Sequence, residues 1–192
     1  IAINPKDKRF QTFEEMIKYA QENELTATTS GVGSNDHMAI LLLNKHYNTK
    51  ITPIHTEGAA EGSTQVLGGH VDLFIAKVGE AAHHHSNGEL KAIAVNSEER
   101  SPFMSEVPTT VEMGYPEIIH RSARGLAAPA GISDEVLKKL SDALEKAIVN
   151  EEQVEKMGTQ GLQVFHLGPK EYTEMMKEDE AQVESLSDLL GY

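Results

Sequence analysis

Short β-branched runs alternate with amphipathic runs along the first half of the chain. Thr12-Phe13-Glu14-Glu15 has the form of a capping box, in which the Thr12 hydroxyl accepts from the Glu15 amide while the Glu15 carboxylate reaches back, and it predicts a helix that ends near Asn23. The remaining pattern predicts strands at 1–4, 25–29, 51–55, 71–76 and 90–96, and helices at 35–47, 59–67 and 79–86. Connections of only a few residues between these elements are typical of a parallel α/β sheet.

The alternation breaks after Asn96. Pro108–Gly114 predicts one short helix ended by its glycine, and 118–128 predicts an extended segment that crosses between lobes. A longer helix is predicted over 134–149, where one face carries Val136, Leu140, Leu144 and Ile148. A strand over Leu162–Leu167 and a last amphipathic helix with an acidic face complete the prediction.

Composition and charge exclude several classes of protein. The 192 residues contain no Cys, which excludes disulfides, Cys-ligated zinc and a Cys nucleophile. With 17 Lys+Arg against 30 Asp+Glu, the net charge of −13 argues against a nucleic-acid partner, because phosphate binding requires a basic face. No apolar run approaches the ~20 residues of a membrane span. The chain opens with Ile1 rather than Met and shows no signal peptide, so we expect it to be part of a longer protein.

The Gly-rich turn between the second predicted strand and its helix is the first candidate site. It reads Thr29-Ser30-Gly31-Val32-Gly33-Ser34-Asn35-Asp36-His37. Two glycines allow close approach of the backbone, and free amides at a helix start form an anion site. The third glycine of a dinucleotide fingerprint and the Gly-Lys-Ser/Thr of a P-loop are missing, so phosphate has weak support and a carboxylate fits equally well. A plain turn with Ser34 or Asn35 as helix cap remains an alternative.

Two further turns are expected to lie beside the first. Gly58 and Ala59 follow the next predicted strand, and Glu80 follows the one after that. The carboxyl ends of parallel strands meet at one edge of a sheet, where ligands collect. The sequence therefore predicts a binding crevice bordered by three strand-to-helix turns.

The chain offers no catalytic constellation. His83, His84 and His85 cannot all ligate one ion, because adjacent residues of a helix point about 100° apart, and no HExxH or carboxylate-partner sequence pattern accompanies them. No GxSxG elbow and no ordered Ser/His/Asp set are present. We expect no metal, no cofactor and no enzymatic activity.

The succession of motifs resembles the receptors of tripartite tricarboxylate transporters, also called the Bordetella-uptake-gene (Bug) type. The resemblance rests on the Gly-rich turn and on six later motifs in the order and spacing of the family. These are Glu57-Gly58-Ala59-Ala60, Leu67-Gly68-Gly69-His70-Val71-Asp72, Asn87–Val95, Glu99-Arg100-Ser101-Pro102, Val107-Pro108-Thr109 and Gly125–Gly131. Each motif alone is loose, and their succession over almost the whole chain is specific.

The resemblance implies a type II periplasmic-binding-protein fold, with two α/β lobes around a cleft. Ile1–Lys8 would be a crossover strand, Arg9–Arg121 a complete doubly wound lobe, and 122–192 the returning crossover with the C-terminal part of an incomplete first lobe. The residues implied to bind a small carboxylate are Ser30, Gly31, Gly33, Ser34, Asn35, His37, Gly58, Ala59, Glu80 and Arg124. The ligand would be a di- or tricarboxylate, an acidic amino acid or an aromatic acid, delivered to the membrane components of the transporter from a periplasmic or extracellular, membrane-associated site.

Departures from the family pattern carry further expectations. Glu57 stands where the family usually has a Lys, so either it points away or the ligand carries a positive group. The segment that normally precedes Ile1 builds half of the first lobe. We therefore expect weak or absent ligand binding by this chain alone, and self-association through, or disorder within, 122–192. Two other functions stay open: the effector-sensing domain of a transcriptional regulator, and a nucleotide-binding enzyme domain that uses the Gly33 turn.

Overall fold

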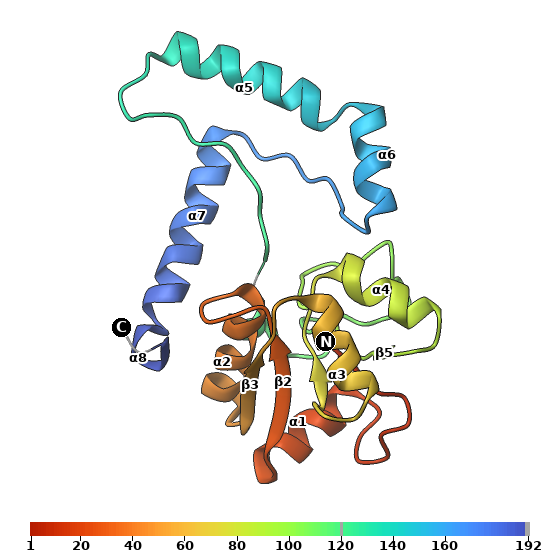
Figure 1. The fold of residues 1–192 in the computed structure, drawn as a ribbon. Coiled ribbons are helices and arrows are strands. Elements are labelled where there is room, and N and C mark those ends of the chain that lie inside the picture. The colour runs from red at the N-terminus through yellow and green to blue at the C-terminus, as the bar shows by residue number, and fades with distance from the viewer. Residues whose placement is uncertain (120, 191–192) are drawn as a thin grey trace. The chain divides into compact units, whose positions relative to one another are not determined.

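The computed structural model describes residues 1–119 and 121–190. The chain divides into two compact units (Figure 1). The first unit comprises Ile1–Ser122 together with the C-terminal residues from Leu186 onward, and the second comprises Ala123–Ser185. Each unit is described below by itself.

A five-stranded sheet lies at the centre of the first unit. Its strands are β1 (Ala2–Ile3), β2 (Leu25–Thr29), β3 (Ile51–His55), β4 (Leu73–Phe74) and β5 (Lys91–Ala92), in the order β3-β2-β4-β1-β5. β2 runs parallel to β3 and β4 as predicted, but β1 is antiparallel to both β4 and β5, so the sheet is mixed. The prediction of a parallel sheet was wrong for β1, which lies antiparallel between two strands that run parallel to each other.

Helices connect the strands in the predicted order: α1 (Phe13–Glu22), α2 (Asn35–Tyr47), α3 (Ala59–Leu67) and α4 (Val78–Ser86). The capping box at the start of α1 is confirmed. The Glu15 amide donates to the Thr12 hydroxyl at 3.2 Å, and the Thr12 amide donates to the Glu15 carboxylate at 3.2 Å. These two bonds satisfy donors that the first turn of a helix leaves without partners.

Alternate residues of the strands point into two separate cores. Ile3 and Leu73 belong to a core with apolar residues of α1 and α2, whereas their strand neighbours Ala2 and Phe74 belong to a core with Val66 of α3 and Ala81 of α4. Successive side chains of a strand point to opposite faces, so the two helix pairs cover opposite faces of the sheet. This is the doubly wound α/β lobe that the sequence predicted.

The short helix predicted over Pro108–Gly114 does not form. Thr109 pairs with Val95 in an isolated parallel bridge, and turns follow until a short 3₁₀ helix, η1 (Pro116–Ile118). The Thr110 amide also donates to the carbonyl of Val95 at 2.9 Å. Tertiary pairing with the segment after β5 therefore holds Thr109 extended, which overrides the helix-start signal of Pro108.

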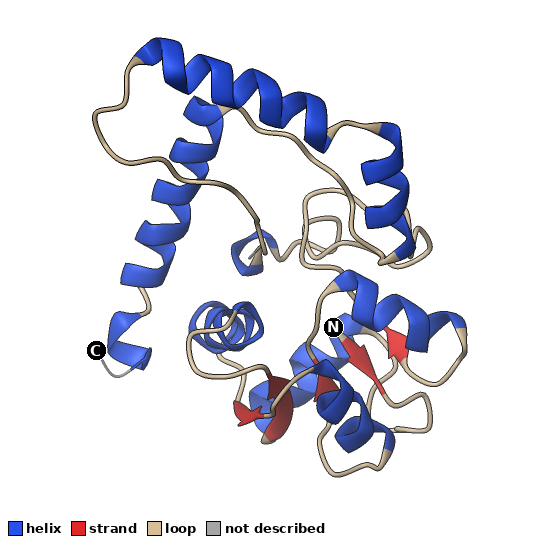
Figure 2. Cartoon of the chain, turned by 45° about the horizontal axis from the view of Figure 1, so that its top comes forward, coloured by secondary structure: helices blue, strands red, loops and turns tan. Residues whose placement is uncertain are grey.

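The second unit contains helices and loops (Figure 2). Its helices are α5 (Asp134–Ile148), α6 (Glu151–Thr159) and α7 (Pro169–Glu184), and a short α8 (Ser187–Leu190) follows in the first unit. The strand predicted over Leu162–Leu167 was wrong, because the residues between α6 and α7 are irregular. No strand forms anywhere in Ala123–Ser185, so this segment has no partner for the hydrogen bonds of a sheet.

α5 forms as predicted, but its apolar face is exposed. Val136 and Leu140 are 47% and 49% exposed, and neither α5 nor α6 has a buried residue. Among the described residues, no helix combines the length and the apolar character that a membrane span requires.

Candidate functional site

Three strand-to-helix turns lie at one edge of the sheet, as the sequence predicted. Thr29 at the end of β2 pairs with His55 at the end of β3, and Thr28 pairs with Phe74 at the end of β4. The Thr56 amide donates to the carbonyl of Thr29 at 2.8 Å, which joins the first two turns directly. The polar groups of Ser30–Asp36, Thr56–Ala59 and Lys77–Glu80 are thereby placed on neighbouring strand ends.

The strand order places a topological switch point at this edge. The chain leaves β2 through α2 toward β3 on one side, whereas it leaves β4 through α4 toward β5 on the other side. β2 and β4 are neighbours, so the turns that follow them diverge. Ligands of open α/β sheets bind where such connections diverge, beyond the carboxyl ends of the strands.

Three of the predicted site residues in the first turn use donor groups within the turn itself. Gly31 N–H donates to Thr29 Oγ1 at 3.3 Å, and Gly33 N–H donates to His37 Nδ1 at 3.1 Å. The amide and hydroxyl of Ser30 donate to Asp36 Oδ2 at 3.2 and 2.8 Å. In this conformation Ser30, Gly31 and Gly33 shape the turn, and the Asp36 carboxylate occupies the donors of Ser30.

The start of α2 keeps donors available. Ser34 is the N-cap, and its hydroxyl oxygen accepts from His37 N at 3.2 Å, which leaves the hydroxyl proton free to donate outward. Within the described residues, the backbone amides of Asn35 and Asp36 have no acceptor. These two amides and the Ser34 hydroxyl are donors at the positive end of the α2 dipole, the kind of position where proteins bind anions.

The second turn offers a similar helix start. Gly58 is the N-cap of α3 and supplies no side-chain acceptor, so the amide of Ala59 in the first turn of the helix has no partner among the described residues. The Glu57 side chain is exposed, and its amide donates to the Glu61 carboxylate at 2.9 Å. The Ala59 amide is therefore left over at this helix start, and the role of Gly58 and Ala59 as amide donors to a ligand stays a prediction.

The third turn is closed by its own ion pair. The Glu80 carboxylate accepts from the Lys77 amide at 3.0 Å and lies 3.9 Å from Lys77 Nζ. Glu80 thus caps α4 in the described conformation. Lys77, which stands directly beside the switch point, is the more suitable side chain for an anion at this turn.

His37 lies beneath the first turn. It is 6% exposed, and its ring meets that of His55 edge to face, with the centroids 5.2 Å apart. Burial, with a smaller contribution from His55, lowers the pKa of His37 below its ordinary value of 6.5. The ring is therefore neutral at pH 7, and it acts as an acceptor for Gly33 rather than as a cation for a ligand.

The cation that sequence reasoning missed is Arg121. Its backbone carbonyl accepts from Asn35 Nδ2 at 3.0 Å, so Arg121 is fixed beside the first residue of α2. Its guanidinium lies 3.9 Å from the carboxylate of Glu98, a loose pair in which the two side chains are 47% and 73% exposed. The signal in the sequence was a second Arg only three residues before the predicted Arg124.

Arg124 belongs to the second unit and is exposed. Close packing explains why a glycine follows Arg124. A Cβ at Gly125 would lie 2.4 Å from Cζ of Tyr172, so the Tyr172 ring covers this stretch of backbone. Gly125 therefore lets α7 pack against the segment that carries Arg124.

The histidines of α4 pair with acids and do not converge on an ion. His84 Nδ1 lies 2.6 Å from Glu89 and His85 Nε2 lies 2.9 Å from Glu106. No group of three or more potential metal ligands exists among the described residues.

The sequence model of a protein family, described as the tripartite tricarboxylate transporter family receptor, matches residues 1–191. The chain belongs to this family. A Polaromonas solute-binding protein of the family, solved without ligand, superposes with a TM-score of 0.88 at 25% identity, covering 97% of this chain and 64% of that one. A Rhodopseudomonas palustris protein with bound malate superposes with a TM-score of 0.73 at 22% identity, covering 98% of this chain and 65% of that one.

Curated relatives agree with the family. A Cupriavidus necator protein is 28% identical over 191 residues, which cover 98% of this chain and 58% of the relative. The Bordetella pertussis protein BugT is 27% identical over 163 residues, covering 84% of this chain and 50% of the relative. The chain thus spans about half the length of its curated relatives. The family and its structural neighbours are solute-binding receptors rather than enzymes.

Proposed function

We propose that this chain is a ligand-binding part of a periplasmic receptor. The receptor captures a small carboxylate and passes it to the membrane components of a tripartite tricarboxylate transporter. The observation that carries the proposal is the pair of helix starts at one sheet edge. The amides of Asn35 and Asp36 in α2 and of Ala59 in α3, which have no acceptor in the described part of the chain, lie beyond neighbouring parallel strands. Two convergent sets of amide donors bind a carboxylate without needing a lysine.

Arg121 supplies the positive charge that the amides lack. Its main chain is held at the start of α2, and its loose pair with the exposed Glu98 is the kind of contact that a better-placed carboxylate displaces. The planar guanidinium can accommodate both oxygens of one carboxylate. The family resemblance assigns a similar role to Arg124.

Relatives of known ligand state support the carboxylate class. One structural neighbour from R. palustris was solved with malate and another with adipate, and both ligands are dicarboxylates. The acidic groups at the edge here, Asp36 and Glu57, favour a ligand that also carries an ammonium group, such as an acidic amino acid.

The alternative of an effector-sensing domain would use the same edge of the sheet for a similar ligand. It predicts a DNA-binding segment elsewhere in the parent protein, whereas the receptor predicts an export signal. The relatives favour the receptor, because a family of transporter receptors matches the chain from end to end.

Titration of the ¹⁵N-labelled chain with malate, adipate and aspartate at millimolar concentrations tests the proposal. We expect shift changes concentrated at the amides of Asn35, Asp36 and Ala59, with weak affinity for this chain alone. Arg121→Gln should weaken the strongest binder about tenfold, Arg121→Lys should restore part of the affinity, and Arg100→Gln, an exposed arginine paired with Glu112, should change little. Shift changes that are uniform over the chain, or absent at these amides, would contradict the proposal.

A further inference from the structure

Two histidines are connected to the glycine amides of the Gly-rich turn, His37 directly and the exposed His55 through the Thr29 hydroxyl. His37 Nδ1 accepts from Gly33 N–H at 3.1 Å. Thr29 Oγ1 accepts from Gly31 N–H at 3.3 Å and lies 2.6 Å from His55 Nδ1. We infer that His37 and His55 position this turn for ligand binding, and that protonation of His37 releases it. The inference rests on the proposed function, since the same turn leads into the amides of Asn35 and Asp36.

The turn needs such support because its backbone is unusual. Gly31 and Gly33 adopt φ values of 129° and 72°, and nothing lies within 4 Å of a Cβ added at either position. No neighbouring atom therefore occupies the space next to these glycines that a side chain would take. A glycine without such restraint populates many backbone conformations, because it has no Cβ. The hydrogen bonds from the two amides select the observed one.

The bond to Gly33 fixes the protonation state of His37. An Nδ1 atom that accepts a hydrogen bond carries no proton, so the neutral ring holds its proton on Nε2. Protonation at Nδ1 would set an N–H against the N–H of Gly33 and remove the bond. The ring is 6% exposed and has the His55 ring 5.2 Å away, so burial and a like charge both oppose this protonation, in agreement with the lowered pKa of His37.

The other charged groups around His37 do not offset these effects. Asp36 precedes it in α2, but its carboxylate is engaged by the amide and hydroxyl of Ser30. Around the end of β3 stand His55 and the exposed Glu57. The turn itself, from Ser30 to Ser34, carries no charged side chain.

Release of the turn changes the binding edge. Gly33 leads directly into Ser34, the N-cap of α2. A turn that has lost the Gly33 bond orients Ser34 and the first amides of α2 less firmly. Affinity for a carboxylate should therefore fall as the pH falls, opposite to the rise that an added positive charge alone would produce.

An NMR titration of the full chain without ligand, from pH 8 to pH 5, tests the inference directly. We expect the Gly33 amide resonance to move with the same midpoint as the His37 ring carbons, below the ordinary histidine pKa of 6.5. A Gly33 amide that does not respond, or that follows a different midpoint, overturns the inference. This readout contains no carboxylate, so its failure is distinct from failure of the proposed function.

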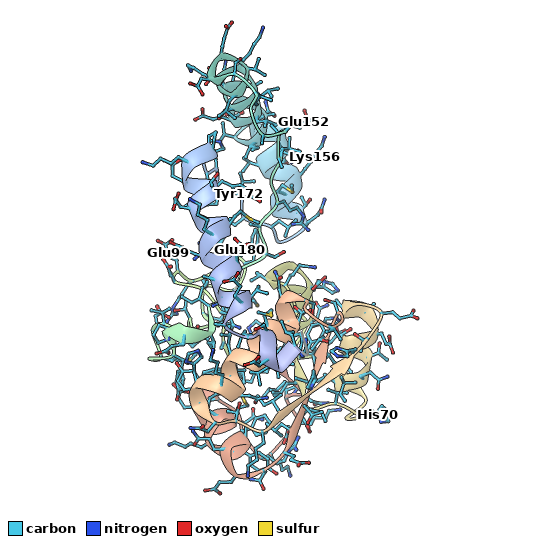
Figure 3. All side chains as sticks on the ribbon, turned by 90° about the vertical axis from the view of Figure 1, so that its left-hand side faces the viewer. His70, Glu99, Glu152, Lys156, Tyr172 and Glu180 are labelled. Atoms are coloured by element: carbon cyan, nitrogen blue, oxygen red, sulfur yellow. The ribbon has the colours of Figure 1, made fainter. Side chains whose placement is uncertain are left out.

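Variants separate positioning from simple stability. In His37→Asn the amide oxygen replaces Nδ1 as acceptor but cannot be protonated, so the Gly33 resonance should stay fixed across the range. His70 is an exposed histidine beyond the end of α3, and Figure 3 shows it at the periphery of the first unit. In the control variant His70→Asn, the Gly33 amide resonance should titrate as it does in the unaltered chain. With malate as probe, the affinity of the unaltered chain divided by that of His37→Asn should fall as the pH is lowered from 7.5 to 5.0. An unchanged ratio, or a Gly33 titration that persists in His37→Asn, overturns the inference.

Discussion

The two compact units use their apolar residues in opposite ways. In the first, side chains such as Phe13, Leu42 and Phe74 are at most 2% exposed and fill cores on both faces of the sheet. In the second, α5 presents Val136 and Leu140 to solvent. The same amphipathic pattern thus produces a helix in both units, but burial, which supplies most of the stability, occurs mainly in the first.

Matched truncations should show the largest difference. Leu42→Ala removes a side chain that is 2% exposed and should cost about 2–5 kcal/mol of unfolding free energy, because it leaves a cavity. Leu140→Ala removes one that is 49% exposed and should cost less than about 0.5 kcal/mol. Urea denaturation of both variants measures the difference, and equal losses would mean that the α5 face is covered in solution.

Polar contacts should follow the same order. Asp72 accepts from the amide and hydroxyl of Thr26 at 2.7 and 2.8 Å and pairs with Arg9 at 2.6 Å, so Asp72→Ala should cost about 1–3 kcal/mol. The exposed pair of Lys156 and Glu152 on α6 (Figure 3) also measures 2.6 Å, yet Lys156→Ala should cost only about 0.3–0.5 kcal/mol. Denaturation at low and at high salt measures both losses of unfolding free energy. Equal losses in the Lys156 and Asp72 variants would contradict the expected order.

Two helical glycines, one in each unit, differ in the space around them. A Cβ at Gly62 in α3 would lie 3.2 Å from Cβ of Thr28 and 3.3 Å from Cε2 of Phe74, so Gly62→Leu should overpack the sheet face and cost about 1–3 kcal/mol. A Cβ at Gly158 in α6 meets nothing within 4 Å, and Gly158→Leu should stabilise the helix by up to about 1 kcal/mol. Thermal unfolding of the two variants should give shifts of opposite sign.

The smallest effect concerns pH and the first unit alone. The folded state lowers the pKa of His37 below 6.5, so the unfolded state binds more protons in acid. The stability that neutral His37 contributes is complete above pH 6.5 and is lost as the pH falls through its folded pKa. Tm should therefore fall slightly more on acidification in the unaltered chain than in His37→Asn. If Tm depends on pH identically in both, His37 does not contribute to the loss of stability in acid.

Local signals in the sequence were sufficient for most of the first unit. The capping box at Thr12, the strands over 25–29 and 51–55 and the Gly-rich turn each act through neighbours close in the chain, and each formed as predicted. The strands predicted over 1–4, 71–76 and 90–96 also form, but each extends over only two residues. The reversed direction of β1 and the extended backbone at Thr109 were missed because distant segments determine them. Leu162–Leu167 has a strand-like composition, but a strand exists only where another strand can pair with it.

The candidate site divides in the same manner. The sequence determined that helix starts with Ser34, Asn35, Gly58 and Ala59 would share one edge, because parallel strands bring their carboxyl ends together. Which donors remain for a ligand depends on contacts formed in the folded chain. Ser30 donates to Asp36, Gly33 donates to His37, and the carbonyl of Arg121 accepts from Asn35. Hydrogen-bond partners depend on distances of a few tenths of an ångström between side chains, and a one-dimensional pattern of residue types does not specify these distances.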